Sequence, residues 1–334
     1  MILITGAAGY IGSHTAMNLI KNGYDIAVFD NFSTGHIETV ETLKEKSKSL
    51  GQNFEFIKGD LKNKEDIDNV FKKLKIEAVI HFAAYSQVGE SVIKPKKYYE
   101  NNVIGTFNLL NSMVENNVLK IVFSSTAATY GEPKYTPIDE NHPQSPINPY
   151  GQTKLVIEKI MDDYDKAYGL KSIRLRYFNV IGANFEDKIG EWHTPETHLV
   201  PNILKSAGSD KTFKIFGDDY NTPDGTCIRD YVDVEDLAEA HRLSLIYINK
   251  NNKTDVFNLG TQLGSSVKEV FAAAKEVLNK EIPVEIAPKR EGDPAILLAD
   301  SKKAKEVLGW KPIGNLKNSI QKANEWEKIL KAYL

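Results

Sequence analysis

Three glycines at intervals of three residues stand near the start of the chain, in the segment Gly6–Gly12, GAAGYIG. A short apolar run, Met1–Thr5, precedes them, and the amphipathic segment Tyr10–Asn22 follows at once. This order predicts a buried strand, a tight turn and a helix. Glycine lets the backbone approach a pyrophosphate closely, and the free N–H groups that begin a helix attract an anion. The segment therefore predicts a dinucleotide-binding turn.

The next predicted strand ends at an acidic residue, Asp30, which indicates the type of dinucleotide. Asp30 lies 18 residues after Gly12. A carboxylate at this place accepts hydrogen bonds from the ribose hydroxyls of adenosine and repels a 2′-phosphate. We therefore predict NAD rather than NADP. A turn without a ligand is the alternative, and the strand, helix and acid together argue against it.

Short apolar runs and amphipathic stretches alternate through the first half of the chain. The predicted strands are Met1–Thr5, Asp25–Asp30, Phe54–Lys58, Ala78–Phe82, Lys120–Ser125 and Ser172–Tyr177. The predicted helices are Tyr10–Asn22, Ile37–Leu50, Lys64–Leu74, Pro95–Asn116 and Tyr150–Tyr168. This alternation predicts an α/β fold with a Rossmann-type, doubly wound parallel sheet that helices cover on both faces.

The regular alternation of strands and helices ends at about residue 180, where loops rich in Gly, Pro, Asp and Asn separate the predicted helices. These helices are Leu199–Ala207, Val234–Ile248, Ser266–Leu278, Ser301–Leu308 and Leu316–Tyr333. We expect an NAD-binding domain over 1–178 and a smaller α/β substrate-binding domain over 179–334, with some crossing of the chain between the two.

Composition excludes several classes of partner. The 42 Lys and Arg against 45 Asp and Glu give a net charge of −3, which offers no basic field for nucleic acid or for a membrane surface. The single cysteine, Cys227, fits a reducing compartment. The start lacks the features of a signal peptide, and no window approaches the ~20 apolar residues of a membrane span. We expect a cytoplasmic protein.

His193 and His198 are five apart in a loop, and no further Cys or His completes a site, so we expect no metal centre.

Tyr150 and Lys154 are the sharpest catalytic signal. Residues four apart on a helix lie about 40° apart around its axis, so both side chains can face one cleft. A tyrosine with its usual pKa near ~10 is a poor base at neutral pH. A lysine ammonium and the positive ring of an oxidised nicotinamide can stabilise its phenolate. An amphipathic helix with a surface lysine is the alternative, and the position after a strand and a long loop argues against it. Thr126, at the end of that strand, is expected to contact a substrate hydroxyl, with Ser124 and Ser125 nearer the cofactor.

At this point the chain resembles the UDP-glucose 4-epimerase family of the extended short-chain dehydrogenase/reductase superfamily over nearly its whole length. The matching blocks are Gly6–His14, Asp30-Asn31, Gly59-Asp60, His81–Ala84, Val88–Ser91, Asn101–Val103, Phe123–Gly131, Pro149–Lys154, Leu175–Asn179, Phe216–Tyr220, Asp224–Thr226, Arg229–Tyr231 and Arg290–Asp293. So many ordered blocks make a chance likeness negligible.

The resemblance implies an isomerase of galactose and nucleotide-sugar metabolism, which interconverts UDP-glucose and UDP-galactose through a transient 4-keto sugar and tightly bound NAD. Tyr150, Lys154 and Thr126 would be the catalytic residues. The cofactor would be held by Gly6, Gly9, Tyr10, Ile11, Gly12, Asp30, Asn31, Ser33, Thr34, Gly35, Asp60, Leu61, Phe82, Ala83, Ala84, Ser86, Asn101, Ser124, Tyr150, Lys154, Tyr177 and Phe178. The nucleotide sugar would be held by Thr126, Tyr150, Asn179, His198, Leu199, Lys214, Phe216, Arg229, Arg290 and Asp293.

The chain departs from the pattern of this family at several positions. Many members carry a lysine beside the cofactor phosphates where this chain has Ser86, and an asparagine pair where it has Thr197-His198. Leu297 falls where the family places a residue that bounds the sugar's 2-position. Leucine is intermediate in size, so turnover of UDP-N-acetylglucosamine and UDP-N-acetylgalactosamine is an open hypothesis.

Three other functions compete with epimerisation. A nucleotide-sugar 4,6-dehydratase needs an acid/base pair beside the threonine, where this chain has Ala127-Ala128. A decarboxylase acting on a glucuronic sugar shares the tyrosine and the lysine, and it stays open. A catalytically silent NAD-binding regulator would be expected to have lost Tyr150 or Lys154. The resemblance also implies a homodimer formed through the helices Pro95–Asn116 and Tyr150–Tyr168.

Overall fold

A computed structural model describes residues 1–209, 211–289 and 294–333. Within these residues a parallel sheet of seven strands dominates the fold, in the order β11-β6-β5-β4-β1-β2-β3. The strands are β1 (Ile2–Thr5), β2 (Ile26–Asp30), β3 (Phe54–Lys58), β4 (Ala78–His81), β5 (Lys120–Thr126), β6 (Lys171–Tyr177) and β11 (Asp255–Leu259). The central strands β1 and β4 are buried along their whole length, as expected for a sheet covered on both faces. The predicted Rossmann-type sheet is confirmed.

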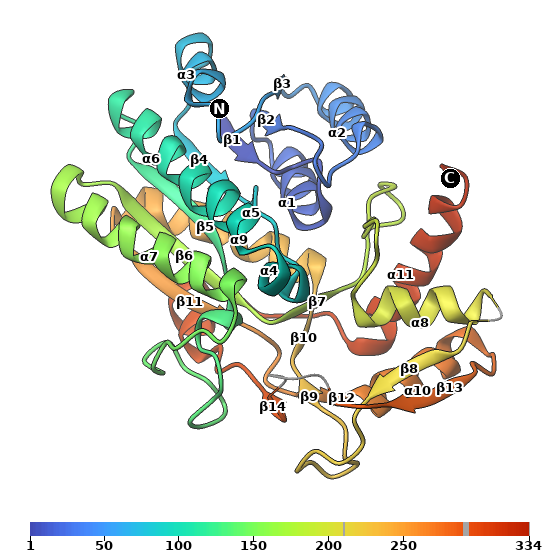
Figure 1. Cartoon of the computed structure of the whole chain (residues 1–334). Helices are drawn as coiled ribbons and strands as arrows, with labels where there is room; N and C mark the ends of the chain where they lie inside the picture. The colour runs from blue at the N-terminus through green and yellow to red at the C-terminus, as the bar shows by residue number, and fades with distance from the viewer. Residues whose placement is uncertain (210, 290–293, 334) are drawn as a thin grey trace.

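Two layers of helices cover this sheet (Figure 1). One layer consists of α1 (Tyr10–Lys21), α2 (Ile37–Leu50) and α9 (Val234–Asn251), whose apolar faces join one core cluster with the sheet. The other consists of α3 (Lys64–Lys73), α6 (Gly105–Glu115) and α7 (Pro149–Tyr168), which share a second cluster. Residues from beyond 179 supply both α9 and the edge strand β11, so the chain crosses back into the large sheet. The domain boundary at 178/179 stays a prediction.

The long helix predicted over Pro95–Asn116 is a composite in the structure. A short helix α5 (Pro95–Tyr98) passes through a π-helical segment, Tyr99–Ile104, into α6. Inside that segment the Asn102 amide accepts from the Tyr85 N–H at 2.9 Å and donates to the Tyr85 carbonyl at 3.0 Å. A wide helical turn often marks a functional site, and here it brings Asn101 to the wall of the main cavity.

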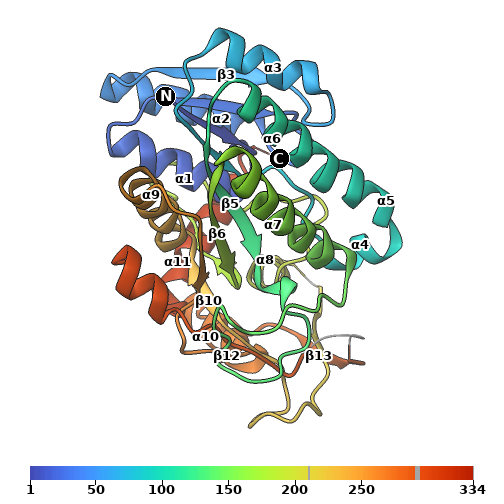
Figure 2. The ribbon, with the colours of Figure 1, turned by 90° about the vertical axis from the view of Figure 1, so that its left-hand side faces the viewer.

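The C-terminal elements form a smaller α/β unit beyond the carboxyl ends of β5 and β6 (Figure 2). Its helices are α8 (Leu199–Ala207), α10 (Val267–Leu278) and α11 (Leu316–Leu330), which pack around a third core cluster. Short strands form three small sheets: β7 (Asn179–Ile181) with β10 (Tyr231–Asp233), β8 (Phe213–Phe216) with β13 (Val284–Ala287), and β9 (Ile228–Arg229) between β12 (Ser265–Ser266) and β14 (Ile296–Leu297). A capping box begins α10, because Ser266 and Glu269 bond each other's backbone N–H groups.

Three further short elements complete the described chain, and one of them is the 3₁₀ turn Ala127–Thr129 after β5. A helix α4 (Val88–Ile93) follows β4, and a π-helical turn, Ala304–Leu308, covers only the second half of the helix predicted from Ser301. The described helices include none that is both long enough and apolar enough to cross a membrane.

Candidate active site

One large cavity, of about 1320 Å³, opens between the carboxyl edge of the parallel sheet and the C-terminal unit. Parallel strands end at one edge, so residues far apart in the sequence meet there. Of the predicted cofactor residues, all but Gly35 line this cavity, and so do all the described residues predicted for the nucleotide sugar. Gly35 instead packs on Ala8, since an added Cβ would lie 2.6 Å from the Ala8 side chain. Arg290 and Asp293 lie outside the described residues.

The glycine turn forms a cradle that only glycine can build. Gly6 has φ +79°, and a Cβ there would lie 2.6 Å from the backbone nitrogen of Ala83. A Cβ on Gly12 would lie 2.3 Å from the carbonyl oxygen of Gly6. Within the described residues no side chain caps α1, and its first turn contains no acid. The positive end of this helix therefore faces the cavity without an internal partner, which fits a bound pyrophosphate.

The acid at the end of β2 is held in place by the turn. Asp30 is buried, and it accepts from the Ala8 N–H at 3.0 Å and from the Phe32 N–H at 2.9 Å. Burial raises the pKa of this carboxyl, and the backbone donors oppose that shift. Each carboxylate oxygen keeps a lone pair for a further donor, so the group can accept a ribose hydroxyl. The residues present fit an adenosine dinucleotide without a 2′-phosphate.

Local sequence places Tyr150 on the first turn of α7. The Asn148 side chain caps the helix by accepting from the Gly151 N–H at 2.9 Å, and Pro149 occupies the first helical position. A Cβ on Gly151 would lie 2.4 Å from the carbonyl oxygen of Ala128, so the helix approaches the end of β5 very closely. This contact brings the buried Tyr150 phenol to the Thr126 hydroxyl, which forms a hydrogen bond with it.

Burial dominates the protonation of the two predicted catalytic side chains. It raises the pKa of Tyr150 to about 12, against the smaller effect of the Thr126 hydrogen bond. It lowers the pKa of Lys154 to about 7, against the attraction of Glu158. The Lys154 ammonium donates to the Ser124 carbonyl at 2.7 Å and lies 4.7 Å from the centre of the Phe123 ring. The protein alone therefore keeps the phenol protonated at neutral pH.

Buried polar partners fix the strands that carry this site. Arg176 of β6 donates from Nε to Glu158 of α7 at 3.0 Å, and a second bond from its NH2 group completes a fork. Burial raises the pKa of Glu158, but the Arg176 guanidinium holds it below its ordinary value. His81 lies between the hydroxyls of Thr5 and Thr106, at 2.6 and 2.8 Å. Burial lowers the pKa of His81 to about 3, so this ring is neutral and structural.

The C-terminal unit forms the other wall of the cavity. Asn179 begins β7, and His198 and Leu199 begin α8. Lys214 and Phe216 lie on β8 and Arg229 lies on β9. The Arg229 guanidinium donates to the Pro294 carbonyl at 2.7 Å and to the Ile228 carbonyl at 3.0 Å, which fixes its direction. These residues come from four elements, so sequence spacing alone could not place them together.

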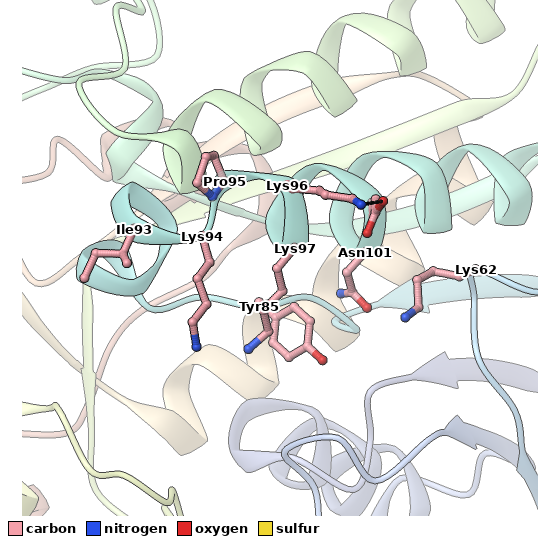
Figure 3. A pocket seen from close by; sticks show the side chains of 9 residues that line it. Lys62, Tyr85, Ile93, Lys94, Pro95, Lys96, Lys97 and Asn101 are labelled. Carbon is pink, nitrogen blue, oxygen red and sulfur yellow. Dashed lines mark ion pairs between the residues drawn. The ribbon is translucent and has the colours of Figure 1, made fainter.

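A second, smaller depression of about 530 Å³ lies over α5 and is lined by lysines (Figure 3). Its lysines are paired: Lys62 with Asp60 at 3.6 Å, Lys94 with Glu90 at 3.3 Å and Lys96 with Glu100 at 3.6 Å. Because carboxylates accompany these charges, the depression is an ion-paired surface at the rim of the main cavity.

Comparison with known proteins gives consistent results. The family model described as GDP-mannose 4,6 dehydratase matches residues 3–323. The UDP-glucose 4-epimerase of Lactobacillus helveticus is 53% identical over 329 residues, which cover 98% of this chain and 97% of that protein. The chain belongs to the UDP-glucose 4-epimerase family.

Solved structures of this family have the same fold. A crystal structure of a UDP-glucose 4-epimerase matches with a TM-score of 0.92 and 48% identity, over 99% of this chain and 98% of that one. The structure of UDP-glucose 4-epimerase from Brucella ovis in complex with NAD matches with a TM-score of 0.89 and 43% identity, over 97% of each chain. The predicted family and fold are confirmed.

Sequence reasoning missed several residues of the cavity wall. Gln87, Val88 and Gly89 line it at the start of α4, a helix too short to show a period. Glu191 and Glu196 also line it, beside His193 and His198. In the sequence these four residues form the pattern Glu-x-His-x-x-Glu-x-His, in which two carboxylates accompany His193 and His198.

Proposed function

We propose that this chain is an NAD-dependent UDP-glucose 4-epimerase, which interconverts UDP-glucose and UDP-galactose through a 4-keto sugar. The observation that carries the proposal is that Thr126, Tyr150 and Lys154 face one cavity with the glycine cradle. When bound, oxidised NAD supplies the hydride acceptor for sugar C4 and later returns the hydride.

Tyr150 is the general base and acid of this reaction. Its phenolate takes the proton of the sugar 4-hydroxyl, directly or through the Thr126 hydroxyl. After the 4-keto sugar has rotated to present its opposite face, Tyr150 gives the proton back. Burial raises the pKa of Tyr150 to about 12, so Tyr150 needs nearby positive charge to act as a base at neutral pH. The Lys154 ammonium and the oxidised nicotinamide are the two sources of that charge. The base is therefore active only when the oxidised cofactor is in place.

The residues of the two walls have different tasks. Asp30 and the uncapped start of α1 hold the ribose and the pyrophosphate of the cofactor, and Ser86 lies beside them without the charge of a lysine. Asn179, Leu199, Phe216 and Arg229 hold the nucleotide diphosphate of the substrate, for which a guanidinium fork is well suited. Arg290 and Asp293 are assigned to the same task by the family resemblance.

Dehydration at C5 and C6 of the sugar is the competing reaction, because the matching family model has the description GDP-mannose 4,6 dehydratase. That reaction needs an acid and a base beside Thr126. The chain has Ala127 and Ala128 there, in a short 3₁₀ turn, and neither side chain transfers protons. This observation favours epimerisation.

The test uses the purified chain with UDP-galactose and no added cofactor. Formation of UDP-glucose is the expected result, because the NAD that the chain retains ends each turnover unchanged. A product lacking the 6-hydroxyl would contradict the proposal. The same assay with UDP-N-acetylglucosamine tests the role of Leu297, which is half-buried on β14. Absence of turnover would exclude N-acetyl sugars.

We also propose a cytoplasmic homodimer. Ile104 and Phe107 of the composite helix and Tyr168 of α7 are 50%, 45% and 54% exposed, and these helices lie side by side on one face. An apolar surface of this kind on neighbouring helices supports a helix-to-helix interface. Sedimentation velocity checks it: a single species with the mass of one chain would contradict the dimer.

A further inference from the structure

Four side chains that take no part in the proposed proton and hydride transfers converge just before α8. Glu191, His193, Glu196 and His198 each direct one ligand atom to a common point, and these atoms all lie within 4.8 Å of one another. Glu191 and Glu196 are almost fully buried, with side chains 7% and 4% exposed. The segment therefore places two imidazoles and two carboxylates around a single position.

The separations within this group suit a small cation. Nδ1 of His198 lies 2.7 Å from Glu191 and 3.0 Å from Glu196. Nδ1 of His193 lies 3.2 Å from Glu191 and 3.8 Å from Glu196. A tetrahedral zinc ion with bonds of about 2.0–2.1 Å holds its donor atoms about 3.3 Å apart. These four separations lie within about 0.6 Å of that value, and the remaining ones in the group are at most 4.8 Å.

One observation within the group points to a ligand. Nδ1 of His193 is buried and makes no hydrogen bond with any residue that the structure describes, although it lies 3.2 Å from a Glu191 oxygen. A buried nitrogen that lacks a hydrogen bond, beside two carboxylates, favours a bound cation.

We propose that Glu191, His193, Glu196 and His198 bind one divalent transition-metal ion of the zinc type. Imidazole nitrogen and carboxylate oxygen are ligands that zinc accepts, and two carboxylates with two neutral imidazoles balance its charge. All four ligands come from the protein, so the site is structural.

The neighbours of this segment show what the ion would hold together. Trp192 stacks on His36 with ring centres 3.6 Å apart, and His36 precedes α2 of the NAD-binding part. On the other side, Trp326 of α11 donates to the Glu191 carbonyl at 2.8 Å. The loop is thus fixed to both parts of the molecule, and α8 begins directly after His198. The metal would set the position of His198 and Leu199 on the cavity wall.

The test is metal binding by the complete chain, free of any polyhistidine tag and treated with a chelator that is then removed. Titration with zinc chloride and elemental analysis should give one zinc per chain. Cobalt(II) should produce the visible absorption bands of a low-coordinate histidine site. His193→Asn and Glu196→Gln should lower the affinity at least about tenfold, a loss typical even of groups that only orient a ligand.

Glu186→Gln is the matched control, since this exposed glutamate lies on the same loop outside the cluster. It should bind zinc as the wild-type chain does. Substoichiometric uptake by the wild type would overturn the proposal and leave a cluster of ion pairs only. Equal affinities of Glu186→Gln and Glu196→Gln would also overturn it. If a cluster variant fails to fold, the wild-type stoichiometry and the cobalt spectrum still decide.

Discussion

The two walls of the active-site cavity are built in different ways. The cofactor wall consists of the ends of buried parallel strands, and its turn tolerates no Cβ at Gly6 or Gly12. The opposite wall consists of strands of two to four residues and of loops, with Asn179, Phe216 and Arg229 on separate elements. A sheet held by two apolar cores keeps its edge fixed, whereas short strands on a smaller core can adjust.

This difference matches the demands of the proposed reaction. The cofactor ends each turnover unchanged and must stay in place, while the 4-keto sugar has to turn between two hydride transfers. A rigid wall suits the first demand, and an adjustable wall suits the second. Variants that affect only one wall can test this division.

The largest effect is expected from the group between the two walls. Tyr150→Phe removes the proton acceptor and should lower kcat by about 10²–10⁴-fold, the usual contribution of general acid–base catalysis. The variant should keep its NAD, because the cradle and Asp30 are untouched. Steady-state rates with UDP-galactose, and NAD released by denaturation, measure both quantities.

Tyr168→Phe is the control on the same helix, because its side chain is 54% exposed and lies outside the cavity lining. It should retain full activity. Full activity of Tyr150→Phe would disprove the mechanism, and loss of NAD from that variant would show that the two walls are not independent.

Local sequence patterns predicted the cofactor wall, whereas the residues of the opposite wall were assigned only through the family resemblance, for a physical reason. The strand, turn and helix around Gly12 are local, and an acid at a fixed distance, Asp30, completes the motif. Tyr150 and Lys154 are also neighbours on one helix turn. On the other wall the strands β7 to β10 and β12 to β14 have two to four residues, too few to show an alternating pattern.

The same argument explains where the structure differs from what the sequence pattern indicates. Sequence spacing could not show that Gly35 packs on Ala8, because that contact joins two segments in space. The π-helical segment Tyr99–Ile104 has the composition of an ordinary helix, and tertiary bonds of Asn102 define it. Glu191 and Glu196 lie in an irregular loop, which has no periodic pattern that would place them on the cavity wall.

Gly12→Ala should damage the cofactor wall alone. The added Cβ would lie 2.3 Å from the Gly6 carbonyl oxygen, and overpacking of this kind costs about 1–3 kcal/mol. We expect NAD affinity to fall about 10–100-fold, so that activity depends on added NAD. Restored activity at high NAD with an unchanged KM for UDP-galactose would confirm that the sugar wall is intact.

Gly208→Ala is the matched control, because its Cβ would meet its nearest atoms at an ordinary 3.7 Å. It should purify with as much NAD as the wild type. Equal NAD content in Gly12→Ala and Gly208→Ala would contradict the cradle as the anchor of the cofactor.

Arg229→Gln should damage the opposite wall alone. A hydrogen bond to a charged group contributes about 1.5–3 kcal/mol, so loss of one diphosphate contact should raise KM for UDP-galactose about tenfold or somewhat more. The NAD content should not change. Arg242→Gln, an arginine of α9 that pairs with Glu239, is the control and should leave KM unaltered. An equal KM in both variants would remove Arg229 from the substrate site.

The smallest expected effect concerns stability and pH at Lys154. Burial lowers the pKa of this lysine to about 7, whereas the unfolded chain keeps the ordinary value near ~10.5. Between these values the unfolded state binds more protons than the folded state, so the free energy of unfolding should rise with pH. The rise contributed by Lys154 should be about 1 kcal/mol between pH 7.5 and 8.5. Urea unfolding at both pH values measures it.

Lys154→Met should lack this increment, while Lys159→Met, an exposed lysine of the same helix, should keep it. The increment between the two pH values is measured for the wild type, Lys154→Met and Lys159→Met. The other titrating groups contribute equally to all three increments, so they cancel when the increments are compared. The same increment in Lys154→Met as in Lys159→Met would show that Lys154 stays charged in the folded protein. The ammonium would then support the Tyr150 phenolate permanently, and the base would no longer depend on the oxidised cofactor for its positive charge.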